Sequence, residues 1–106
     1  MKLITKTLEE RFEKIGCQSQ SSDPIIVAKF FDPCGSATWY ATEYDAENKI
    51  AFGYVTGLAF DEWGTFSITE LESIKRPFGL GIERDIYFKE KRFKEIIKEQ
   101  DNDLEH

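Results

Sequence analysis

Histidine is almost absent from this sequence of 106 residues, because the single example is His106 at the very end. The last tripeptide, Leu104-Glu105-His106, resembles the remnant of an expression tag. We therefore set residues 104–106 aside and expect residues 1–103 to form a single domain. That domain has no histidine for a Ser-His-Asp triad, a zinc site or a proton relay.

Cysteine is scarce as well, since the chain has only Cys17 and Cys34. Their spacing is not the Cys-x-x-Cys pattern of redox motifs and zinc sites, and no histidine is available as a base. We expect two free thiols with an incidental role. The sequence also has no recognisable nucleotide-binding loop, so we expect no cofactor.

Long hydrophobic runs are missing. No segment approaches the ~20 apolar residues that a membrane span needs, and residues 1–6 lack the apolar run of a signal peptide. We expect a cytoplasmic protein without membrane contact. Acidic residues outnumber basic ones by 20 to 14, which disfavours nucleic-acid binding because phosphates are neutralised by Lys and Arg.

What the chain does have is typical of a globular protein: 41% hydrophobic and 32% charged residues, with 14% aromatic residues. Aromatic residues favour pleated, half-buried surfaces. The hydrophobic periodicity predicts, in chain order, a helix over 5–15, strands over 25–31, 37–44, 50–56 and 63–66, a helix from 67 to about 75, a strand over 82–88 and a helix over 91–100.

Local signals support these boundaries. Thr5, or Thr7 with Glu10, is suited to cap the first helix, and Gly16 is suited to end it. Ser67 with Glu70 forms a second capping box, after which Leu71 and Ile74 are expected to face inward. Short connections favour antiparallel neighbours. The fold class is therefore α+β: an antiparallel β-meander of four to five strands with an N-terminal helix, a short helix after strand four and a C-terminal helix.

Strand alternation assigns side chains to faces. In the second strand, Trp39 and Ala41 are expected on one face, opposite Thr38, Tyr40, Thr42 and Tyr44. In the third strand, Gly53 lies opposite Ile50, Phe52 and Tyr54. We expect Gly53 to mark a close approach of another element.

The predicted strands are rich in aromatic residues: Trp39, Tyr40, Tyr44, Phe52, Tyr54, Trp63 and Phe66. A domain this small has no room for all of them in one core, so part of the sheet is expected to present an aromatic face. Such a face suits a protein partner, because Tyr and Trp are enriched at binding hot spots. Stacking of unpaired bases is an alternative, but strands two to four carry only Lys49 as a basic residue. The third alternative is that these rings simply form the core.

Two groups of carboxylates have alternative interpretations. Glu43, Asp45 and Glu47, with Asp61 and Glu62 in the next loop, are hard oxygen ligands of the kind that Mg²⁺ binds, or are simply solvated. Glu83 and Asp85 flank Arg84 and are expected to share a strand face, as acid–base chemistry requires. An ion-pair network with Arg84, Arg76 and nearby lysines explains the same pattern.

The chain resembles a family of short, uncharacterised bacterial proteins known as domain of unknown function 2958. The resemblance is carried by Lys2-Leu3-Ile4-Thr5, Lys29-Phe30-Phe31, Thr38-Trp39-Tyr40-Ala41-Thr42-Glu43, Phe52-Gly53-Tyr54-Val55 and Pro77-Phe78-Gly79-Leu80-Gly81-Ile82-Glu83-Arg84-Asp85. It implies cargo of plasmids, phages and other mobile elements. It brings no catalytic residues with it.

The leading hypothesis is a non-catalytic protein-binding accessory module of a mobile genetic element. The expected contact residues are Trp39, Tyr40, Glu43, Tyr54, Glu83, Arg84 and Asp85. One alternative is a small divalent-metal-dependent hydrolase or nuclease-like enzyme that uses Glu43, Asp45, Glu83 and Asp85. Another is an acidic inhibitor that mimics nucleic acid.

Overall fold

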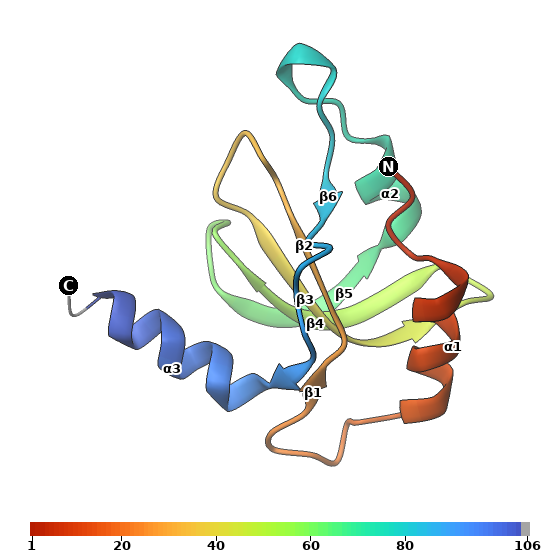
Figure 1. Cartoon of the computed structure of the whole chain (residues 1–106), viewed down its shortest axis with the longest axis vertical. Coiled ribbons are helices and arrows are strands. Elements are labelled where there is room, and N and C mark those ends of the chain that lie inside the picture. The colour runs from red at the N-terminus through yellow and green to blue at the C-terminus, as the bar shows by residue number, and fades with distance from the viewer. Residues whose placement is uncertain (105–106) are drawn as a thin grey trace.

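The fold is α+β, with an antiparallel sheet and helices towards both ends of the chain (Figure 1). The computed structural model describes residues 1–104, with side chains up to residue 101. In this part of the chain, the main sheet has five strands in the order β5-β4-β3-β2-β6. The elements are α1 (Lys6–Ile15), β1 (Ile25–Ile26), β2 (Ala28–Phe31), β3 (Thr38–Asp45), β4 (Ile50–Thr56), β5 (Glu62–Ser67), α2 (Ile68–Ser73), the short 3₁₀ turn η1 (Pro77–Gly79), β6 (Glu83–Arg84), β7 (Lys91–Arg92) and α3 (Phe93–Leu104).

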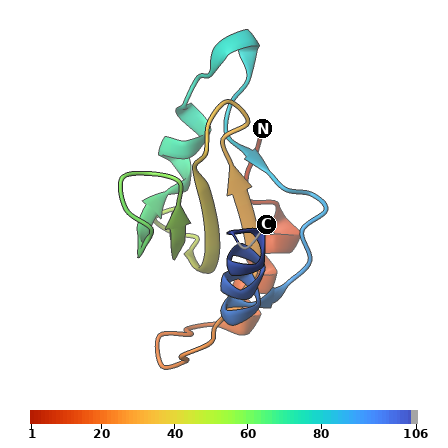
Figure 2. The same ribbon diagram turned by 90° about the vertical axis from the view of Figure 1, so that its left-hand side faces the viewer.

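Two clusters of apolar side chains lie on opposite faces of this sheet. The inner face packs against α1 and α2, and its core includes Leu3, Phe12, Phe30, Trp39, Ala41, Ala51, Ile68 and Leu71. The outer face packs against α3 through Ile26, Tyr40 and Ile96, with Tyr54, Phe88 and Phe93 around them. Figure 2 shows the loop between β4 and β5 on one side of the molecule and the loop after β6 on the other.

The helix caps agree with the sequence signals. The Thr5 hydroxyl accepts a hydrogen bond from the Leu8 N–H at 3.2 Å, and Gly16 ends α1 with a positive φ of 71°. The Ser67 hydroxyl accepts from the Glu70 N–H at 3.1 Å. The prediction for Ile74 was wrong: α2 ends at Ser73, so Ile74 follows the helix and is 39% exposed, while Leu71 is buried.

The predicted continuous strand over 25–31 is in fact two strands. β2 pairs with β3 and β6, whereas β1 turns aside to pair with β7. All of Ile26, Val27, Ala28 and Phe30 are buried, which explains the continuous apolar run. The pairing with β3 stops because β3 has a β-bulge at Thr42, just where β1 would continue the ladder.

Because of the bulge, the predicted faces of β3 are wrong for the residues that follow Thr42. Ala41 pairs with Gly53 and Glu43 with Phe52, so Thr42 is an extra residue and the alternation reverses after it. Tyr44 therefore does not share a face with Tyr40. It lies on the inner face, where its ring is 5.7 Å from that of Phe12.

The expected close approach at Gly53 is confirmed. A Cβ built on Gly53 would lie 1.9 Å from the carbonyl oxygen of Tyr40, which is backbone of the neighbouring strand β3. Only a residue without a side chain fits there.

The last predicted strand, over 82–88, is much shorter in the structure. β6 contains only Glu83 and Arg84, because the Asp85 carboxylate then accepts a hydrogen bond from the Tyr87 N–H at 3.0 Å and closes a turn. Ile86 and Tyr87 consequently lie in an exposed loop.

The terminal helix begins two residues later than predicted, since Lys91 and Arg92 form β7. Ile96 is buried and Phe93 half-buried, as the apolar stripe predicted. Just before β7, Glu90 forms an ion pair with Arg11 of α1 at 2.7 Å. No helix within residues 1–104 has the length and apolar character needed to cross a membrane. Part of the predicted tag remnant, residues 105–106, lies outside the described residues.

Candidate functional site

Four aromatic rings gather on the outer face of the sheet, and we call them the aromatic cluster: Phe52, Tyr54, Trp63 and Phe93. The Trp63 ring centroid lies 5.9 Å from Phe52, 5.3 Å from Tyr54 and 4.7 Å from Phe93. Register explains the arrangement, because Tyr54 faces Trp63 across β4 and β5, and α3 adds Phe93. Trp63 remains 37% exposed, so the cluster is accessible from solvent.

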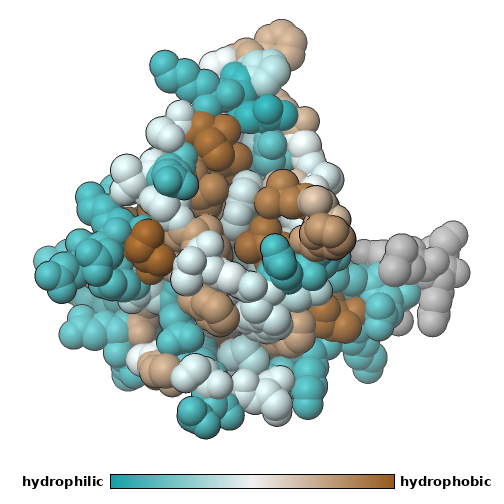
Figure 3. Space-filling view, turned by 180° about the vertical axis from the view of Figure 1, so that it is seen from behind, coloured by the Kyte–Doolittle hydropathy of each residue, from teal (hydrophilic) through white to brown (hydrophobic). Residues whose placement is uncertain are grey.

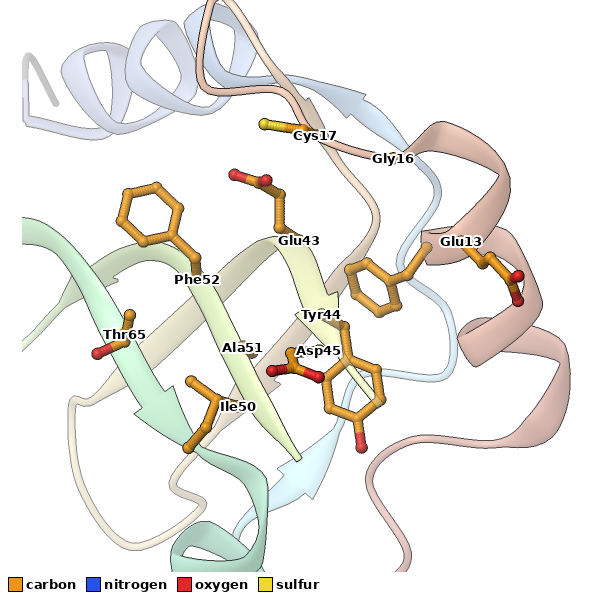
Figure 4. A pocket seen from close by; sticks show the side chains of 11 residues that line it. Glu13, Gly16, Cys17, Glu43, Tyr44, Asp45, Ile50, Ala51, Phe52 and Thr65 are labelled. Atoms are coloured by element: carbon orange, nitrogen blue, oxygen red, sulfur yellow. The ribbon is translucent and has the colours of Figure 1, made fainter. Parts of the chain in front are cut away.

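Beside the cluster, the loop between α1 and β1 forms the wall of a hollow of about 340 Å³. Its lining residues are Gln18, Ser19, Ser21, Ser22, Pro24, Thr42, Glu43, Phe52, Trp63 and Phe93. A neighbouring hollow of about 390 Å³ shares Glu43 and Phe52 with it. Figure 4 shows the Glu43 side chain pointing towards Cys17, beside the Phe52 ring. The site therefore combines an exposed indole, a half-buried carboxylate and a polar loop.

The loop is held in place by the side chain of Gln18. Its amide nitrogen donates to the carbonyl oxygens of Ile25 and Thr42, both at 2.9 Å, and its amide oxygen accepts from the Ile25 N–H at 2.7 Å. These contacts satisfy backbone groups where β1 has left β3 at the bulge. Gln18 is thus a positioning residue for the site, and no local sequence signal pointed to it.

Replacement of Gln18 with alanine should lower the free energy of unfolding by about 1–3 kcal/mol, because it leaves half-buried backbone groups without partners. Urea unfolding measures this change. The matched control is Gln20→Ala, since Gln20 is exposed and its removal should cost less than about 0.5 kcal/mol. Equal stability of the two variants would contradict the positioning role.

Tyr40 lies on the same face as the aromatic cluster but is buried, at 8% exposure. Burial raises the pKa of its phenol above the ordinary value; a hydrogen bond to Gln100 lowers it, while the charges of Glu99 and Asp85 raise it further. The Lys29 ammonium lies 5.8 Å from the ring centroid of Tyr40. Tyr40 thus supports the packing of α3 on the sheet.

A raised phenol pKa means that the folded protein favours neutral Tyr40. This contribution to stability is fully present below about pH 10 and is lost as pH rises through the raised pKa. Tyr40→Phe should therefore lose less stability than the wild type on going from pH 9 to about pH 11.5. Denaturant unfolding at a series of pH values tests this, and parallel curves for the two proteins would contradict it.

The remaining predicted contact residues lie apart from the aromatic cluster. Trp39 is on the inner face at 7% exposure. Arg84 donates to the carbonyl oxygens of Lys2 and Leu3 at 3.1 and 3.0 Å and so holds the N-terminal segment. Asp85 pairs with Lys29 at 3.8 Å, near Tyr40. Glu83 pairs with Phe31 in the register of β2 and β6.

The structure therefore brings Tyr40, Glu43 and Tyr54 to the outer face together, and it adds Phe52, Trp63 and Phe93. Trp63 was within reach of sequence reasoning, because a short β4–β5 connection places it opposite Tyr54. Phe93 was not, since its position depends on how α3 folds back.

The acidic turn after β3 is organised by Asp45. Its carboxylate accepts hydrogen bonds from the backbone N–H groups of Glu47 and Asn48 and from the Asn48 side chain. The hydrogen bonds from Asn48 lower the pKa of Asp45. In the part of the chain that the structure describes, no three His, Cys, Asp or Glu side chains converge in a way that suits a metal ion.

Comparison with known protein families identifies a match for most of the chain. The family model described as a protein of unknown function, DUF2958, matches residues 3–99, from the buried Leu3 into α3. No curated protein and no solved structure matches the chain. The family match confirms the resemblance found in the sequence.

Proposed function

The chain belongs to the family of proteins of unknown function DUF2958, and we propose that it is a non-catalytic protein-binding module that serves a mobile genetic element. The mobile-element context comes from the family resemblance. The binding role rests on one observation, the solvent-accessible Trp63 at the centre of the aromatic cluster.

Several features of the outer face favour a protein partner. Tyr and Trp dominate binding hot spots because they bury much apolar surface and lose little conformational entropy. The cluster is bordered by polar groups, Glu43 and the serine-rich loop, as interface cores are bordered by a polar rim. The acidic balance of the chain disfavours a nucleic-acid strand stacked on the same rings.

The test is affinity capture from a lysate of the bacterial host, with mass spectrometry of the retained proteins. We expect a partner in stoichiometric amount on the wild-type chain and its loss with Trp63→Ala. The matched control is Phe78→Ala, because Phe78 is an aromatic residue at 98% exposure, in the 3₁₀ turn that projects at the top of Figure 1.

The control variant should retain the partner as the wild type does. Retention of the same proteins by wild type and Trp63→Ala would move the site away from the aromatic cluster. Failure of the wild type to retain any protein at low and at high salt would contradict the binding module itself.

A further inference from the structure

Strand β5 has an open edge. Within residues 1–104 it pairs with β4 on one side and with no strand on the other. The Ile68 N–H donates to the Lys49 carbonyl at 2.9 Å, and this pair continues the register of β4 and β5. Because antiparallel hydrogen bonds alternate along a strand, Gly64 and Phe66 point their backbone groups at β4, while Trp63 and Thr65 point theirs outward. The open edge thus offers free donors and acceptors at Trp63 and Thr65.

A groove of about 490 Å³ runs along this edge, on the side away from the aromatic cluster. Its apolar lining comes from Trp39, Val55, Leu58, Ala59, Phe60, Phe66 and Leu71. Leu58 and Phe60 are 60% and 76% exposed, and hydrophobic side chains gather on this face of the molecule in Figure 3. Apolar surface of this kind is costly to leave in water unless something covers it.

Gly64 leaves the groove open in its middle. A Cβ built on this residue meets no atom within 4 Å. A chain paired with β5 would therefore place every second side chain over Gly64 and into the groove, and the others beside Trp63 on the outer face. Both faces of an added strand would find apolar contacts.

The charges around the groove indicate which kind of segment binds there. Its ionisable lining residues are both acidic, Glu62 and Glu70, and both are exposed. Asp61 stands next to Glu62 and accepts a hydrogen bond from the Gly57 N–H at 3.1 Å. Basic side chains at the ends of an incoming segment would complement these carboxylates. A second copy of β5 would instead bring Glu62 and Glu70 together twice, with repulsion between like charges.

We propose that the β5 edge receives an extended segment of a partner protein, paired through the backbone of Trp63 and Thr65, with apolar side chains in the groove and basic side chains near Glu62 and Glu70. This is the strand-addition mode of peptide recognition. It rests on the proposed binding function and gives it a partner class: a basic, strand-forming segment.

The probe is a fluorescein-labelled peptide, Lys-Thr-Val-Thr-Val-Thr-Lys, which places Lys-Val-Val-Lys on one face of a strand. Its counterpart has Glu at both ends, and a third peptide carries N-methyl groups on the amides of one edge. Fluorescence anisotropy measures affinity, and hydrogen exchange measures protection of the Trp63 and Thr65 amides. We expect the Lys peptide to bind at least about tenfold more tightly than either other peptide and to protect both amides.

Two changes in the protein locate the contact. Glu62→Lys with Glu70→Lys should reverse the preference between the Lys and Glu peptides. The matched control, Glu9→Lys with Glu10→Lys on the exposed side of α1, makes the same change in net charge and should leave the preference unchanged. Gly64→Leu fills the groove and should abolish binding, and circular dichroism checks that this variant is folded. If it is unfolded, the Glu62→Lys, Glu70→Lys variant alone tests whether the peptide binds at the groove.

Equal affinity for the Lys and Glu peptides, or unprotected Trp63 and Thr65 amides, would overturn strand addition. So would a dimer of the wild type that Gly64→Leu dissociates, because it would assign the edge to a second copy. Capture of a cellular partner that survives Gly64→Leu but not Trp63→Ala would retain the binding module and reject the strand pairing. Failure of the strand pairing and failure of the binding module therefore give different experimental results.

Discussion

Gly53→Ala is expected to lower the free energy of unfolding by at least about 3 kcal/mol, which is a large part of the ~5–15 kcal/mol of a small domain. The new methyl group would lie 1.9 Å from the Tyr40 oxygen and 2.9 Å from the Ala41 Cα. Both are backbone atoms of a paired strand, so no side-chain rotation relieves the clash. β3 and β4 must separate, at the middle of the sheet.

The adjacent strand offers a matched control. Gly64 faces Gly53 across β4 and β5, but a Cβ there meets open space. Gly64→Ala should leave stability unchanged or raise it by up to about 1 kcal/mol, because alanine restricts the unfolded chain. Urea unfolding of the two variants is the measurement. Similar losses for both would mean that strand propensity, and not the contact with Tyr40, makes glycine necessary at position 53.

The second large effect is expected for Trp39→Ala, a loss of about 3–5 kcal/mol. The Trp39 indole is 7% exposed and packs in the inner core with residues of both α1 and α2. Its removal leaves a cavity in this core, and the loss of stability grows with the volume that the surrounding elements do not refill. The Trp39→Ala variant should unfold at a lower temperature than the wild type and show a weaker near-ultraviolet circular dichroism signal.

Trp63→Ala is expected to change partner binding much more than it changes the stability of the fold. Trp63 is 37% exposed and touches other rings on one side only of the sheet, so its loss should cost only about 1–2 kcal/mol. The two tryptophans thus make a pair for experiment: one variant tests the core and the other tests the outer face. A Trp63→Ala protein as unstable as Trp39→Ala would show that the aromatic cluster is structural.

The sequence was a good guide wherever a signal is local. Thr5, Gly16 and Ser67 ended or began helices as expected, because capping depends on residues within one turn. The meander from β2 to β5 followed from short connections between apolar segments. The aromatic face of the sheet was predicted for the same reason: strand composition shows that an excess of rings exists.

The faces of the side chains after the bulge were beyond local reasoning, whereas strand alternation correctly placed Trp39 opposite Tyr40. A single extra residue at Thr42 moved Tyr44 to the inner face, and nothing in the residues around it announces a bulge. The break between Ile26 and Ala28 depends on that bulge and on Gln18, whose side chain lies in the loop before β1 and donates to the Thr42 carbonyl. The site inherits these effects, since Glu43 reaches the outer face opposite Phe52 only because of the extra residue at Thr42.

The strand order has a consequence for synthesis on the ribosome. Strands β2 to β5 are neighbours in the chain, so residues 28–67 can pair as soon as they have emerged. β6 and β7 must wait, since they return to β2 and β1 across about half the chain or more, and closing so long a loop costs more entropy than forming a hairpin. In the nascent protein, strands β2 to β5 therefore pair before β6, β7 and α3 are added. Tyr40 and Tyr54 stay exposed to solvent until α3 packs on the sheet.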